Sequence, residues 1–155
     1  MRMTSGTVER DAAMLGRIKA LEGTWTMLDE NGEEIVASVF RATAAGSAVQ
    51  EVMFPGTEHE MVNVYHMDGD ELVVTHYCAA GNQPRMVAQD VQTTAEGAQA
   101  YRFDLESVSN WRHGQHGCMA NLTLTIDGDH LRQTWSSIDE KGNPAGTVVF
   151  ELTRK

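Results

Sequence analysis

The sequence predicts an all-β protein: a closed, antiparallel, up-and-down β-barrel of about ten strands, preceded by one short N-terminal α-helix. Two observations predict this fold. After residue 23, apolar and polar residues alternate over short runs, as they do in half-buried strands. Turn-forming pairs rich in Gly, Asn and Asp separate these runs about every ten residues, as in consecutive hairpins. A meander of ten strands leaves two open edges unless it closes, so a barrel is expected, and one of this width can keep an interior cavity.

The elements follow in order within one domain, 1–155, a length that suffices for a sizeable core. We expect a tail at 1–6, a helix at 8–21 and the barrel over 23–155. The helix is indicated by Met14, Leu15, Ile18 and Leu21, which recur at spacings of three and four. The expected strands are 23–30, 34–43, 47–54, 59–68, 71–79, 84–92, 99–106, 118–127, 130–138 and 146–154.

Charge and composition exclude several classes of function. Twelve Lys and Arg against twenty-two Asp and Glu give a net charge of −10, which argues against nucleic acid and anionic membranes as partners. The sequence has no apolar run of transmembrane length, and its start lacks the shape of a signal peptide. Cys78 and Cys118 are too few for a disulfide framework, so we expect free thiols and a cytoplasmic location.

The hairpin turns assign side chains to the two faces of the sheet. Pairing about Gly128-Asp129 puts Leu122, Leu124 and Leu131 inside, together with Gln133 and Trp135. Pairing about Gly69-Asp70 puts Asn63, Tyr65 and His76 inside. A turn centred on Gly81-Asn82 then places Arg85, Val87 and Gln89 inside, and pairing past Gly142 adds Val148, Phe150, Leu152 and Arg154.

The resulting interior is too polar for a dry core. Its candidate ligand-binding residues are Glu51, Asn63, Tyr65, His76, Cys78, Arg85, Gln133 and Trp135. Each buried polar group costs about 1–3 kcal/mol if it stays unpaired, so these groups either satisfy one another or face a ligand. We expect a small, largely apolar ligand with a polar or anionic head, held by Arg85 and His76, with Met61, Met67 and Phe150 along its apolar part.

Two other classes of function stay open. One is an enzyme that uses His76 as acid or base, with Arg85 or Tyr65 stabilising developing negative charge. The other is a structural module that dimerises through the outward valines Val62, Val64 and Val73. Cys78 lies two residues from His76, too far along a strand for a nucleophilic pair, so no catalytic residue is assigned.

The longest connection, 107–117, is a candidate rim of the binding site. It carries Trp111, Arg112, His113 and His116. His113-x-x-His116 could supply two metal ligands, with His59, His66 or a carboxylate as a third, but a glycine-rich loop does not fix their geometry. We therefore expect neither a metal site nor a cofactor.

Short motifs at both ends of the barrel carry a resemblance to a known family. Leu21-x-Gly23-Thr24-Trp25 and Phe150-x-Leu152-x-Arg154 resemble the calycin superfamily of lipocalins, fatty-acid-binding proteins and nitrobindin-like barrels. The resemblance implies that Trp25 packs near a basic residue of the last strand, a role that Arg154 matches. The strand at 146–154 has no His, so the haem ligand of nitrobindin is missing. Residues 75–86 also look like a segment of bacterial domains of unknown function.

Overall fold

The structure is a computed structural model that describes residues 1–112 and 114–155. Two helical segments, α1 (Val8–Ala13) and α2 (Leu15–Lys19), make up the expected N-terminal helix. The break between them falls at Met14, where ψ reaches −78°. Thr7 begins the helix by accepting a hydrogen bond from the Arg10 backbone N–H at 3.1 Å. No helix in the described ranges has the length and apolar character needed to cross a membrane.

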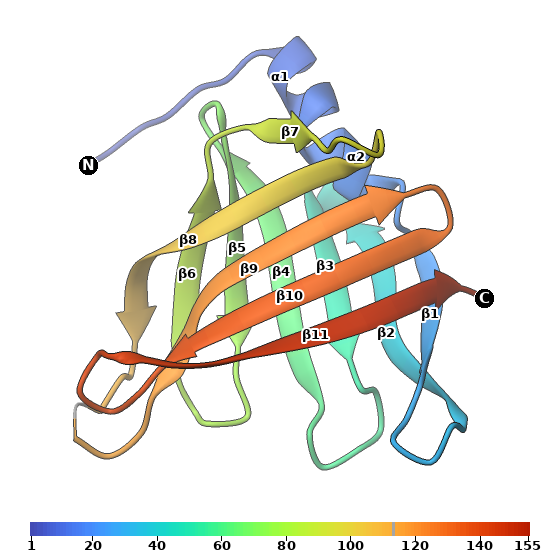
Figure 1. Ribbon diagram of the computed structural model, residues 1–155. Coiled ribbons are helices and arrows are strands. Elements are labelled where there is room, and N and C mark those ends of the chain that lie inside the picture. The colour runs from blue at the N-terminus through green and yellow to red at the C-terminus, as the bar shows by residue number, and fades with distance from the viewer. Residues whose placement is uncertain (113) are drawn as a thin grey trace.

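The rest of the chain forms antiparallel strands. Their bounds are β1 (Gly23–Leu28), β2 (Glu34–Thr43), β3 (Ala48–Met53), β4 (Met61–Asp68), β5 (Glu71–Tyr77), β6 (Gln83–Ala88), β7 (Val91–Thr93), β8 (Gln99–Ser109), β9 (Cys118–Asp127), β10 (His130–Ile138) and β11 (Pro144–Arg154), with a 3₁₀ turn η1 (Ala44–Gly46) after β2. Successive strands pair in order from β1 to β6 and from β8 to β11, and the pairs β1–β11 and β6–β8 close the ring (Figure 1). The three-residue β7 pairs with β8 outside that ring. The predicted closed barrel of about ten strands with a short N-terminal helix is therefore confirmed.

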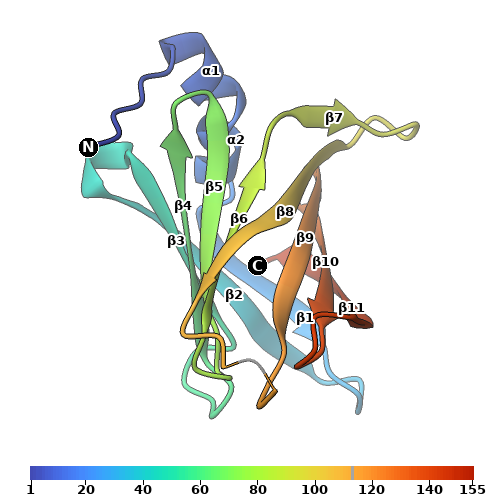
Figure 2. The same ribbon diagram turned by 90° about the vertical axis from the view of Figure 1, so that its left-hand side faces the viewer.

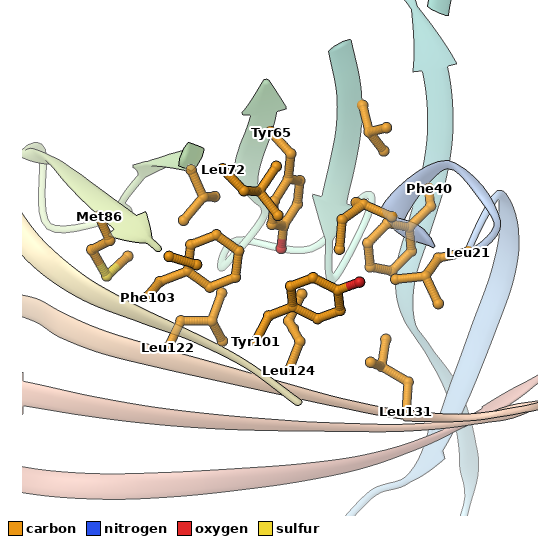
Figure 3. Close-up of a cluster of buried hydrophobic side chains, with 14 of the residues drawn as sticks. Leu21, Phe40, Tyr65, Leu72, Met86, Tyr101, Phe103, Leu122, Leu124 and Leu131 are labelled. Atoms are coloured by element: carbon orange, nitrogen blue, oxygen red, sulfur yellow. The ribbon is translucent and has the colours of Figure 1, made fainter. Parts of the chain in front are cut away.

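The barrel has two different ends. Helices α1 and α2 cover one of them, which we call the helix end, and the β3–β4, β5–β6 and β10–β11 connections lie at the other, the loop end (Figures 1 and 2). Leu15 and Ile18 of α2 are fully buried, so the apolar face predicted for the helix packs onto the barrel. Beneath it, apolar side chains from opposite walls meet in a cluster that includes Phe40, Leu72 and Tyr101 (Figure 3). The helix end is thus closed by a packed apolar core.

Arg154 of β11 contacts both Trp25 and the backbone at the end of the helix. Its guanidinium carbon lies 4.5 Å from the centroid of the Trp25 ring, directly across the β1–β11 pair. The guanidinium also donates to the carbonyl oxygens of Ala20 at 2.9 Å and Glu22 at 2.8 Å. The contact between Trp25 and a basic residue of the last strand, which the family resemblance implies, is present in this chain.

The registers of two predicted hairpins agree with the structure. Leu131 lies opposite Ile126 about the Gly128 turn, and Asn63 lies opposite His76 about the Gly69 turn. Along β11 the inward prediction holds for the buried Leu152, whereas Val148, on the same face as Trp135, is 39% exposed. The barrel core therefore does not cover Val148, although the pairing puts it on the inward face of β11.

The register predicted after β5 is wrong. Thr75 lies opposite Arg85 and the Cys78 N–H donates to the Asn82 carbonyl, so the turn holds three residues, 79–81. Gly81 closes it with a φ of +88°, the conformation that a glycine bulge residue supplies in a three-residue hairpin. The observed strand pairing differs from the pairing predicted with a two-residue turn by an odd number of positions. Every side chain of β6 therefore lies on the face opposite to the predicted one.

Candidate functional site

A row of inward side chains crosses four neighbouring strands. Register pairs Phe40 of β2 with Glu51 of β3, Glu51 with Asn63 of β4, and Asn63 with His76 of β5. Directly paired residues share one face of a sheet, so these side chains lie next to one another inside the barrel. Glu51, Asn63 and His76 are at most 1% exposed. Along β5 the inward positions change from Leu72 and Val74 to His76, so this polar row lies below the apolar core, toward the loop end.

Glu51 is the centre of a buried hydrogen-bond network. Its Oε1 accepts from Asn63 Nδ2 and from the Tyr65 hydroxyl, each at 2.8 Å. Its Oε2 accepts from the Ser38 hydroxyl at 2.5 Å and from Gln133 Nε2 at 2.6 Å. An ionised carboxylate accepts hydrogen bonds and donates none, so four donors match it well. None of these partners is cationic, and Gln133 reaches Glu51 from β10, so the network also spans the interior.

The same network raises the pKa of Tyr65. Burial is the larger cause, and the adjacent negative charge of Glu51 adds to it, because both disfavour a phenolate. Tyr65 therefore stays protonated and serves as a donor to Glu51. A residue engaged in this way is not free to stabilise negative charge on a substrate, as the enzyme hypothesis requires.

Asn63 fixes the tautomer of His76. The Asn63 amide nitrogen donates to Glu51, so its Oδ1 faces the ring and accepts from His76 Nδ1 at 2.7 Å. The proton therefore sits on Nδ1, and Nε2 carries a bare lone pair. Burial lowers the pKa of His76 to about 4, so the ring is neutral at physiological pH.

The bare nitrogen of His76 has no hydrogen-bond partner. Nε2 is buried and unpaired among the described residues. The His76 ring lies against the Trp135 indole, with centroids 4.8 Å apart and planes at 49°. Trp135 is itself held by a hydrogen bond from its Nε1 to Gln133 Oε1 at 3.2 Å. A buried acceptor without a donor costs about 1–3 kcal/mol, and such groups in native proteins often mark a place for a ligand or water.

The structure thus brings together six of the eight predicted site residues. These are Glu51, Asn63, Tyr65, His76, Gln133 and Trp135. Cys78 stands apart at the β5–β6 turn, where its Sγ accepts from the Ala80 N–H at 3.5 Å. Burial raises the pKa of Cys118, so that thiol is not activated as a nucleophile.

The predicted inward position of Arg85 is wrong. Its side chain lies on the outer surface, because the three-residue turn reverses the faces of β6, and Met86 and Ala88 are buried in its place. The guanidinium pairs with Asp68 at 2.7 Å and with Glu106. The cation expected to hold an anionic head group is therefore absent from the polar row.

The predicted site lacks three residues of the interior. The Ser38 hydroxyl donates to Glu51, and Met53 Sδ accepts from Asn63 Nδ2 at 3.2 Å. Asn82, taken as a turn residue, is fully buried and donates to the Gly117 carbonyl at 2.9 Å. Its Oδ1 is the second buried side-chain atom without a partner in the described chain. One signal in the sequence could have indicated that Asn82 lies inside. Pro84, Met86 and Ala88 form the more apolar face of β6, and Asn82 precedes them by an even number of residues.

The loop end adjoins a weakly paired seam. Two register pairs, Trp25–Arg154 and Thr26–Thr153, join β1 to β11. A surface hollow of about 700 Å³ runs along these two strands, from Met27 and Val149 to Arg154. Partly buried side chains cover the core at this end: Met27, Phe54, Met61 and Phe150. Phe54 and Phe150 meet edge to face, with ring centroids 5.4 Å apart. This end is therefore closed by side chains, whereas backbone from α1 and α2 closes the other.

The candidate metal loop receives no support. His113 lies outside the described residues, and His116 Nδ1 lies 3.0 Å from the Asn82 amide nitrogen. His59 is exposed, and His66 is engaged with the Met67 carbonyl. Over 1–112 and 114–155, no group of three or more His, Cys, Asp or Glu side chains could hold a metal ion.

The outer valines do not form a common exposed patch. Val73 is fully buried within the chain, so it cannot contribute to the dimer face expected from the sequence. Val62 and Val64 are partly buried.

The chain matches no protein-family model and no curated protein sequence. Function must therefore be inferred from the geometry of the buried network.

Proposed function

We propose that this barrel binds a small, largely apolar molecule in the loop-end half of its interior, with His76 as the polar anchor. The observation that carries the proposal is the buried, unpaired Nε2 of His76. The Glu51 network is satisfied by its own members, yet it holds His76 in one tautomer and leaves one acceptor without a donor. A purely structural network gains nothing from an unpaired buried acceptor, whereas a binding site uses it.

The ligand enters at the loop end. The helix end is closed by packed backbone and apolar side chains, and the loop end by Met27, Phe54, Met61 and Phe150. Methionine side chains are flexible and adapt to new contacts, so this cover can move aside without disturbing the strands. Trp135, which is 2% exposed and lies tilted against the His76 ring, then forms one wall of the occupied site.

The proposal extends to family and location. A member of the calycin-like barrels, working in the bacterial cytoplasm, accounts for the Trp25–Arg154 contact and for two cysteines that remain free thiols. Both assignments rest on the resemblance and on composition.

Titration with 1-octanol, followed by the indole N–H signals in a ¹H–¹⁵N spectrum, tests the proposal. The signal of Trp135, assigned with Trp135→Phe, should shift and saturate, while that of Trp25 at the helix end stays in place. The proposal fails if no saturable shift occurs up to the solubility limit of the alcohol, or if only Trp111 responds.

A further inference from the structure

We infer that the head group of the bound molecule is an uncharged hydrogen-bond donor, such as a hydroxyl or an amide N–H, and not an anion. This inference rests on the proposed function and names its ligand class. It also replaces the anionic head expected from the sequence.

The unpaired atoms of the interior are acceptors. His76 Nε2 is bare because Nδ1 carries the proton, and Asn82 Oδ1 is a carbonyl oxygen. Within the described residues these two are the buried side-chain nitrogen and oxygen atoms that lack a partner. An incoming molecule can satisfy an acceptor only by donating to it.

The charge of the network points the same way. Glu51 is fully buried, and its four side-chain partners are neutral donors, so its negative charge has no cation beside it. Arg85, the cation expected there, is on the outer surface with Asp68 and Glu106. A carboxylate or phosphate at His76 would place a second negative charge near the first and would oppose lone pair to lone pair.

Protonation of His76 does not rescue an anionic ligand at neutral pH. Burial lowers the pKa of the ring and keeps it neutral there, and His76 is only 1% exposed. An ammonium group brings three N–H donors to a single bare nitrogen and is costly to bury. A neutral head group with one donor therefore fits His76 best.

Three probes of equal chain length separate the possibilities: 1-octanol, 1-methoxyoctane and octanoate, titrated into the full chain at pH 7.5 by calorimetry. The alcohol donates, the ether only accepts, and octanoate is an anion. We expect the alcohol to bind about tenfold more tightly than the ether, the size of one net hydrogen bond, and octanoate to bind most weakly. His76→Phe keeps an aromatic ring but removes the acceptor, so it should equalise alcohol and ether. Arg85→Met, altered on the outer surface, should leave all three affinities unchanged.

The outcomes distinguish the two proposals. If none of the probes binds, the proposed function fails. If the ether binds as tightly as the alcohol, or octanoate binds most tightly, the barrel binds ligands but the inferred donor class is wrong. Should His76→Phe not fold, the ¹⁵N signal of His76 Nε2 in the unmodified protein decides. A shift of that signal with the alcohol and not with the ether supports the inference, and equal shifts overturn it.

Discussion

The His76 ring and the Asn63 amide are joined by a buried hydrogen bond of 2.7 Å, and this contact sets the chemistry of the interior. Because Asn63 donates its own N–H to Glu51, its oxygen must accept from His76. The negative charge of Glu51 thus acts on His76 through orientation: it orients the Asn63 amide, the amide fixes the tautomer of His76, and the tautomer leaves Nε2 as an acceptor.

The stability of the protein should fall between pH 6.5 and pH 4. His76 binds a proton near pH 6.5 in the unfolded chain but only near pH 4 in the folded one, so the unfolded state takes up more protons in this window. Acidification therefore favours unfolding, by about 3 kcal/mol across the window if each pH unit contributes about 1.36 kcal/mol. Urea unfolding at several pH values measures the slope, and His76→Phe should flatten it. An unchanged slope in the variant would assign the effect to other groups.

The pKa values of Asp68, Asp90 and Asp139 are also lowered in the folded protein. Their contribution to stability is lost only below this pH window.

Glu51→Gln should destabilise the protein by roughly 1–3 kcal/mol. The substitution turns one acceptor oxygen into an NH₂ group, which then confronts donors that formerly bonded to it. Chemical denaturation measures the loss, and Glu58→Gln is a matched control because that side chain is 87% exposed. A Glu51→Gln protein as stable as the control would mean that the donors do not depend on the carboxylate.

Arg154→Met should cost about 1–2 kcal/mol, because it removes the contact with Trp25 and the bonds to the Ala20 and Glu22 carbonyls while keeping an apolar stem. The same change at Arg132, whose pair with Glu151 is more than half exposed on both sides, should cost less than about 1 kcal/mol. Thermal unfolding of the two variants provides the comparison. Equal losses would show that the Trp25 contact contributes little.

Arg85→Met should change the free energy of unfolding by less than about 1 kcal/mol, because Glu106 is half exposed and Asp68, although only 13% exposed, keeps its contact with Arg2. Denaturation by urea measures this. A loss of several kcal/mol would contradict the outward placement and favour a buried role for the guanidinium.

Strand order and most faces could be predicted because alternation and two-residue turns specify them. The turns about Gly69 and Gly128 have two residues each, and counting outward from them predicts strand pairs such as Asn63–His76. The loop after Cys78 has three residues, and its odd length put Arg85 on the wrong face.

The side-chain contacts across the barrel interior could not be predicted from the hairpin registers. Gln133 meets Glu51 across the interior, 82 residues away, and no turn register relates these two positions. The break at Met14 and the exposure of Val148 likewise depend on how the helix and the last strand meet the closed barrel.

The protonation of the two His76 nitrogens tests most directly whether Nε2 is an acceptor for a ligand. A long-range ¹H–¹⁵N spectrum at pH 7 distinguishes a protonated nitrogen from a bare one. We expect a proton on Nδ1 and a bare Nε2 whose signal moves when 1-octanol is added. A proton on Nε2, or on both nitrogens, would contradict this expectation, because Nε2 would then have no lone pair to offer a donor.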